Sequence, residues 1–97
     1  MKLIALEIET PGSEDEDFRP HLKAEARRAW ELYQFGVIRE LYFRQDDRTA
    51  VLVLEATSLD EARQALESLP LVQGGLIEFQ ILPLVPYDGF ARLFEEG

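Results

Sequence analysis

The sequence predicts an α+β domain with its elements in the order β-α-β-β-α-β. Three features predict it: short runs of alternating apolar residues, two longer segments with apolar residues at helical spacing, and Gly or Pro between the elements. The 97 residues fit a single domain, since the commonest domain size is roughly 100–150 residues. Hydrophobic residues make up 46% of the chain, which is ample for one core.

The first strand and the first helix are predicted in the N-terminal third. Residues 2–9 alternate in the period of a strand, and Thr10-Pro11-Gly12 ends it. Ser13 and Glu16 have the spacing of a capping box. The main helix is expected at about residues 17–35, with room for a separate turn before it. Its expected apolar stripe and its glycine stop are Phe18, Leu22, Ala26, Ala29, Tyr33 and Gly36.

Three more strands are predicted in the rest of the chain. Residues 37–44 and 50–56 alternate as strands, and the polar loop between them favours a hairpin. Gly74-Gly75 precedes a last strand at residues 76–82. Together with the first strand, they predict a four-stranded antiparallel sheet.

The second helix completes the order, and an arm follows the last strand. Ser58 and Glu61 form a second capping box, and Pro70 ends the helix that starts there. The resulting β-α-β-β-α-β order is the ferredoxin-like arrangement, in one domain spanning residues 1–97. Residues 86–97 are expected to form an amphipathic C-terminal arm, folded either on its own domain or on a neighbouring copy. Its apolar residues at roughly helical spacing are Tyr87, Phe90, Leu93 and Phe94.

The two faces of the predicted sheet differ in composition. We expect the helices to cover the face that carries Ile4, Leu6, Ile8, Leu41, Phe43, Leu52, Leu54, Ile77, Phe79 and Ile81. The second face then carries Leu3, Ala5, Glu7, Ile38, Glu40, Tyr42, Arg44, Val51, Val53, Glu55, Leu76, Glu78, Gln80 and Leu82. This face has too many apolar groups to be left in water and too many carboxylates for a dry core. The sequence therefore predicts a homodimer in which two sheets pack around a partly wet cavity.

Charge and composition narrow the classes of partner and site. The chain has 19 acidic and 10 basic residues, a formal charge of −9, which repels nucleic acid and anionic membranes. No segment approaches the ~20 apolar residues of a membrane span. The absence of cysteine excludes disulfides and thiolate chemistry, and a cytoplasmic location is expected. Four acidic residues share the second face without metal-ligand spacing, so no metal site is expected.

Short motifs spread over most of the chain resemble the muconolactone isomerase family. The run 36–42, Gly-Val-Ile-Arg-Glu-Leu-Tyr, is similar to a Gly-x-Trp-Arg-His-Leu-Trp run of that family, with Glu40 in place of the histidine. Further similar motifs follow in the same order: Leu22-Lys23-Ala24-Glu25, Leu69-Pro70-Leu71, Ile77-Glu78 and Pro83-Leu84. The resemblance implies a dimeric α+β barrel with higher assembly of the dimers. It also implies a cofactor-free proton shift in a small unsaturated lactone acid.

Candidate residues for this chemistry come from the second face. Removing a proton next to a carbonyl needs a base and a group that stabilises the enolate. Glu40 is the first candidate base and Glu78 the second, because partial burial would raise the pKa of either carboxylate. Tyr42 is the candidate donor to the enolate oxygen. The candidate substrate-binding residues are Arg39, Arg44, Lys23 and Glu7, of which Arg39 joins the site only at a strand edge or bulge.

A structural interpretation of the same residues stands beside the catalytic one. Glu40, Arg44 and Glu78 could form ion pairs that fix the register of the dimer. Two functional hypotheses follow: an isomerase-like or ligand-binding dimer, and a non-catalytic self-assembling or accessory protein-interaction module. A monooxygenase-like activity on the same barrel has no specific residue in its favour.

Overall fold

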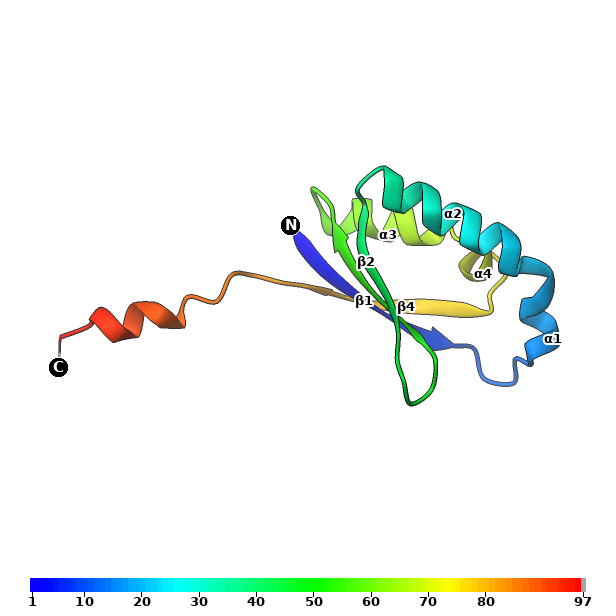
Figure 1. Ribbon diagram of the computed structural model, residues 1–97, viewed down its shortest axis with the longest axis horizontal. Coiled ribbons are helices and arrows are strands. Elements are labelled where there is room, and N and C mark those ends of the chain that lie inside the picture. The colour runs from blue at the N-terminus through cyan, green and yellow to red at the C-terminus, as the bar shows by residue number, and fades with distance from the viewer. Residues whose placement is uncertain (97) are drawn as a thin grey trace.

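The computed structural model describes residues 1–96 and contains a four-stranded antiparallel sheet with helices on one of its faces (Figure 1). The strands lie in the order β2-β3-β1-β4, so β2 and β4 form the two edges. Their bounds are β1 Lys2–Glu9, β2 Ile38–Phe43, β3 Ala50–Glu55 and β4 Ile77–Pro83. The α+β class, the antiparallel sheet and the β-α-β-β-α-β order predicted from the sequence are confirmed.

Two main helices, α2 (Leu22–Gln34) and α3 (Leu59–Glu67), lie over the same face of the sheet (Figure 1). Three short turns of helix accompany them: α1 (Asp15–Phe18) and η1 (Arg19–His21) lead into α2, and α4 (Pro70–Gln73) follows α3. The main helix predicted at about residues 17–35 therefore begins about five residues later than expected, because α1 and η1 form the separate turn before it. Within residues 1–96, no helix is long and apolar enough to cross a bilayer.

Local signals in the sequence mark several of the helix ends. The carboxylate of Asp17 accepts a hydrogen bond from the backbone N–H of Glu14 at 2.9 Å, and Glu14 is the N-cap of α1. The predicted capping box of Ser13 and Glu16 is therefore wrong by one position. Pro70 follows the end of α3 as predicted, and it also begins α4, because proline is favoured at a first helical position.

Ser58 caps α3 as predicted, since its Oγ accepts from the backbone N–H of Glu61 at 3.1 Å. Ser58→Ala is expected to lower the free energy of unfolding by about 1 kcal/mol. For a domain of this size that loss lowers Tm by about 4–8 °C. Ser58→Gly is the matched control, because glycine at this position costs only about a few tenths of a kcal/mol. Thermal unfolding followed by circular dichroism measures both, and equal losses would contradict this role of the hydroxyl.

The core lies between the helices and the sheet, and β1 contributes Leu3 and Ala5, both 0% exposed. Leu3 is paired with Leu54, and Ala5 with Leu52. Residues directly opposite across antiparallel strands lie on the same face, and both leucines are buried under the helices. The predicted facing of β1 is therefore wrong. The residues that point to the open face of the sheet are Ile4, Leu6 and Ile8.

Strand β2 changes its facing at a bulge. Ile38 is paired with Leu54 and Glu40 with Val53, so Arg39 is an extra residue in the ladder. An extra residue resets the alternation of side chains. Ile38, which was predicted on the open face, is consequently in the core and 1% exposed. Beyond the bulge the predicted facing holds, with Glu40 on the open face.

The C-terminal arm leaves the sheet as a continuation of β4 (Figure 1). The backbone N–H of Leu84 still donates to the carbonyl of Lys2 at 2.9 Å, and the 3₁₀ helix η2 (Gly89–Phe94) lies farther along. The described part of the molecule measures 61 × 29 × 20 Å, because the arm runs away from the domain. Gly97, the last residue of the predicted arm, lies outside the described residues. Of the two predicted placements, the structure does not show a lid on the arm's own domain.

Candidate functional site

A pocket of about 420 Å³ opens between α2 and the sheet. Its volume falls within the roughly 300–1,000 Å³ of typical small-molecule sites. Of the apolar stripe predicted for the first helix, every residue except Tyr33 lines this pocket, and the small side chains of Ala26 and Ala29 leave the space open. Most of the wall is apolar: Phe18, Leu22, Ala26, Ala29, Ile38, Leu41, Phe43, Ala50, Leu52, Leu69, Leu71 and Phe79. The polar side chains on it are Glu7, Glu9, Glu25, Tyr42 and Arg48.

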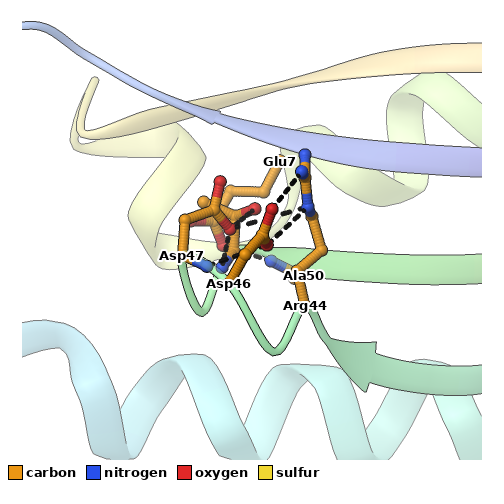
Figure 2. A network of polar contacts seen from close by, with 6 residues as sticks. Glu7, Arg44, Asp46, Asp47 and Ala50 are labelled. Carbon is orange, nitrogen blue, oxygen red and sulfur yellow. Dashed lines mark hydrogen bonds and ion pairs between the residues drawn. The ribbon is translucent and has the colours of Figure 1, made fainter.

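Two half-buried carboxylates give the pocket its chemical character. Glu7, on β1, accepts a hydrogen bond from the backbone N–H of Ala50 at 3.3 Å (Figure 2). Glu25, on α2, accepts one from the backbone N–H of Leu71 at 2.9 Å. Burial is the largest cause of a raised pKa at both groups, and the charge of Glu25 further raises the pKa of Glu7. Two acids with raised pKa values in one pocket are suited to exchanging a proton with a ligand.

The raised pKa of Glu25 predicts a pH-dependent cost to stability. Its pKa in the folded protein lies above the ordinary 4.5. Between the ordinary pKa and the raised pKa of the folded protein, the folded state therefore binds more protons than the unfolded chain. The free energy of unfolding falls as the pH rises through that interval. Glu25→Gln removes this titrating group. The free energy of unfolding of the variant is therefore expected to rise, relative to that of the native protein, as the pH increases from about 4.5. Urea unfolding at a series of pH values measures this difference, and a difference that shrinks with pH would contradict the burial of Glu25.

Arg48 is the one cation among the residues that line the pocket. Its backbone is in the left-handed region, with φ 63°, within the loop between β2 and β3. Its guanidinium lies over the ring of Phe43, 4.9 Å from the ring centroid. A cation held at this rim is placed to meet the anionic end of a ligand whose apolar part enters the pocket.

The predicted pair Glu40 and Tyr42 lies on the open side of the edge strand β2. The hydroxyl of Tyr42 donates to Oε1 of Glu40 at 2.6 Å, and this hydrogen bond is the main cause of the raised pKa of Tyr42. Both side chains are exposed in the single chain, although Tyr42 also contributes to the rim of the pocket. The structure thus brings these two predicted catalytic residues together.

The two arginines among the predicted site residues bond to groups close to them in the chain. The Nε of Arg39 donates to the carbonyl of Gly36 at 2.6 Å, so the bulge turns this side chain back along the chain. Arg44 forms an ion pair with Asp46 at 2.6 Å and another with Asp47 at 3.7 Å (Figure 2). Neither arginine lines the pocket.

The remaining predicted residues are spread over the molecule. Glu78 lies on β4, the edge opposite Glu40, where it lines a smaller hollow of about 170 Å³. Lys23 is exposed on α2. Within one chain only Glu7 and Tyr42, of the seven predicted residues, line the main pocket. Among residues 1–96, no three His, Asp or Glu side chains are grouped so as to hold a metal ion.

Comparison with known proteins addresses the fold. The sequence matches no protein-family model and no curated protein. A muconolactone isomerase of known structure superposes with a TM-score of 0.75 at 17% identity, over 91% of this chain and 92% of the other. The chain has the muconolactone isomerase fold. The 5-chloro-2-hydroxyhydroquinone dehydrochlorinase of Burkholderia phenoliruptrix AC1100, solved with 2,5-dihydroxybenzoquinone, superposes with a TM-score of 0.72 at 19% identity, over 92% and 98% of the two chains.

These superpositions confirm the fold that the sequence motifs resemble. They cover nearly the whole length of each protein. At 17–19% identity they concern the fold alone, and fold does not determine function. The chemistry has to be argued from the side chains of this chain.

Proposed function

We propose that the protein binds a small unsaturated lactone acid in the pocket between α2 and the sheet and shifts a proton within it without a cofactor. The observation that carries the proposal is the pair of half-buried carboxylates, Glu7 and Glu25, within otherwise apolar walls. The names of the two structural neighbours support the ligand class, since muconolactone and dihydroxybenzoquinone are both small unsaturated rings with several oxygens.

Each polar residue of the pocket has a role in this reaction. Arg48 binds the carboxylate of the ligand, and the apolar walls enclose the ring. Glu25, in its charged form, removes a proton from the carbon next to the carbonyl, and the electron pair of that C–H bond moves toward the carbonyl oxygen. Glu7, in its protonated form, donates a proton to a carbon farther along the conjugated system. One C–H bond breaks and another forms, and the proton on Glu25 returns to Glu7 before the next turnover.

The raised pKa values suit these roles. A carboxylate whose pKa is raised by burial is a stronger base when charged, and it stays protonated at a higher pH. Glu7 and Glu25 differ in their surroundings, because His21 acts to lower the pKa of Glu25 whereas the charges around Glu7 act to raise its pKa. Neighbouring acids with different surroundings can hold one proton between them.

Thermal unfolding in the presence of candidate ligands tests the binding step. The panel comprises lactone acids, simple dicarboxylates, enol acids and neutral aromatics. A ligand at ~100 times its Kd adds roughly 2.7 kcal/mol to the free energy of unfolding. Each kcal/mol raises Tm by about 4–8 °C, so we expect a clear rise with lactone acids and none with neutral aromatics. No rise with any compound would count against a ligand-binding function.

A pocket-filling variant is the matched control for that experiment. Ala26 lines the pocket from the exposed side of α2, so Ala26→Trp should fill the space and leave the core intact. We expect the variant to lose the ligand-dependent rise in Tm while keeping the Tm of the free protein. A rise that persists in Ala26→Trp would place the ligand elsewhere on the molecule.

Self-assembly is the second candidate function, and the open face of the sheet favours it. Within residues 1–96, no helix lies over this face (Figure 1). Its apolar side chains are those of Ile4, Leu6, Ile8, Val51, Val53 and Leu82. We propose that two copies pack through this face, which would bury these side chains and bring the Glu40–Tyr42 pair to the interface. Light scattering over a dilution series tests this, and monomer at every concentration would remove the proposal.

A further inference from the structure

The C-terminal arm is a small folded unit with exposed apolar side chains. The rings of Tyr87 and Phe90 meet edge to face with their centroids 5.0 Å apart. The ring of Tyr87 also lies against Gly89 and leaves no room there for a Cβ. These contacts order the arm before it meets anything else. The apolar side chains that stay exposed are Val85, Tyr87, Phe90, Leu93 and Phe94, with exposed fractions of 69–88%.

A second exposed apolar surface lies at the mouth of the pocket, along α2 and the edge strand β2. On β2, Leu41 and Phe43 line the pocket and are 43% and 62% exposed. On α2, Tyr33 lies one turn beyond Ala29, which lines the pocket, so both are on one side of the helix. The ring of Trp30 stacks on that of Tyr33 at 5.9 Å. We call this surface the α2–β2 edge.

The arm and the pocket of one chain are at opposite ends of the sheet, although Trp30 and Tyr33, near the C-terminal end of α2, lie toward the end from which the arm leaves. The arm leaves beside Lys2, where β1 begins, whereas the pocket is bounded by Glu7 and Glu9, where β1 ends. From there the arm runs outward, away from the sheet (Figure 1). Covering the pocket of its own chain would require the arm to reverse direction along the domain. A second copy has no such restriction.

The charges on the two surfaces are complementary. The arm carries Asp88, Glu95 and Glu96 against one arginine. Lys23 and Arg27 lie on the side of α2 that carries Trp30, and Arg48 lies at the rim of the pocket. Within residues 1–96, none of these three cations and none of the three acids of the arm forms an ion pair. The chain as a whole has a charge of −9, so this cationic side of α2 is one of the few surfaces that would attract an acidic arm. Charge pairs across such a contact fix its orientation more than they add affinity.

We infer that the arm of one copy packs across the α2–β2 edge of a second copy and closes the mouth of that copy's pocket. The aromatic side chains of the arm bury the exposed rings of α2 and the exposed apolar residues of β2. The pocket is then complete only in the assembly, with the partner's arm excluding water from it. This contact does not depend on the proposed reaction, since it would form equally in a protein that binds a ligand without converting it.

Disulfide trapping tests the contact directly, because the chain has no cysteine. Tyr33→Cys and Phe90→Cys are made in separate chains and mixed under mild oxidation. Docking raises the effective concentration of the two thiols toward mM, so a mixed covalent dimer should form on the order of 100-fold faster than from undocked chains at μM concentration. The control mixes Phe90→Cys with Gln64→Cys, an exposed position on α3. Equal rates for the two mixtures would overturn the inference.

The doubly substituted chain separates the two ways in which the arm could dock. Tyr33→Cys with Phe90→Cys in one chain should give covalent dimers and larger species when the arm acts between copies. A covalently closed monomer would show instead that the arm folds onto its own domain, and would overturn the inference.

Trp30 gives a second measurement on chains that carry no cysteine. It is the single tryptophan and is 57% exposed in the isolated chain. Removing residues 86–97 should shift its emission to longer wavelength, because the arm no longer covers it. Dilution of the full chain should produce the same shift. Emission that is identical with and without the arm, at every concentration, would contradict the contact even if the cysteine variants failed to fold.

Discussion

Leu3→Ala is expected to lower the free energy of unfolding by about 2–5 kcal/mol, the usual cost of a large-to-small change in a core. Leu3 is 0% exposed and lies opposite Leu54, which is also 0% exposed. Truncation would leave a cavity in the centre of the sheet, where the paired strands cannot move to fill it. Domains of this kind are stable by about 5–15 kcal/mol, so the loss is a large share of the total.

Urea unfolding at low protein concentration measures this loss, and the next residue supplies the control. Ile4 points to the open face and is only partly buried in the single chain. Ile4→Ala should therefore cost about 1 kcal/mol, in keeping with the smaller apolar area that it removes from contact. A larger loss of unfolding free energy in Ile4→Ala than in Leu3→Ala would indicate that β1 has the facing predicted from the sequence.

The order of the elements could be predicted because its signals are local. Thr10-Pro11-Gly12 ends β1, Gly36 with φ 81° separates α2 from β2, and Ser58 starts α3. Each of these residues acts on the backbone within a few positions of itself. Such signals are independent of how the elements later pack, and so a single sequence contains them.

The facing of the strands was harder to predict, because it depends on pairing. In β1, apolar residues occupy both sets of alternate positions, and the bulk of one set predicts that it faces the core. The structure buries Leu3 and Ala5 instead and leaves Ile4 and Leu6 for the open face. Because side chains alternate between the two faces of a sheet, shifting a strand by one residue moves all of its side chains to the opposite face. For this reason Glu7 was expected on the open face, whereas it lies in the pocket.

The pocket itself depends on packing that the sequence does not display. Glu25 and Arg48 line it, and the sequence pattern predicts a site role for neither. A signal was present in part, since Glu25 is adjacent to Ala26 in a predicted apolar stripe with small side chains. Small residues in such a stripe are compatible with a close contact as well as with a hollow. Only the position of α2 relative to the sheet distinguishes the two.

Glu7→Gln is expected to lower turnover of a lactone acid by about 10²–10⁴-fold, the usual contribution of a positioned acid or base. The amide keeps the shape of the side chain, and its oxygen can still accept the hydrogen bond from Ala50. It cannot donate a proton to the ligand. Binding should therefore persist in the thermal unfolding experiment while turnover is lost, and this combination would assign Glu7 to the chemical step.

Glu40→Gln is the decisive comparison, because the two glutamates lie on opposite faces of the sheet. Glu40 is paired with Val53 on the open face, away from the apolar walls of the pocket. If the reaction takes place under α2, the change at Glu40 should leave turnover intact. If two copies meet through the open face, the loss of the charge that accepts from Tyr42 should weaken the dimer. The reverse pattern, with turnover lost at Glu40 and kept at Glu7, would move the reaction into a cavity between two sheets.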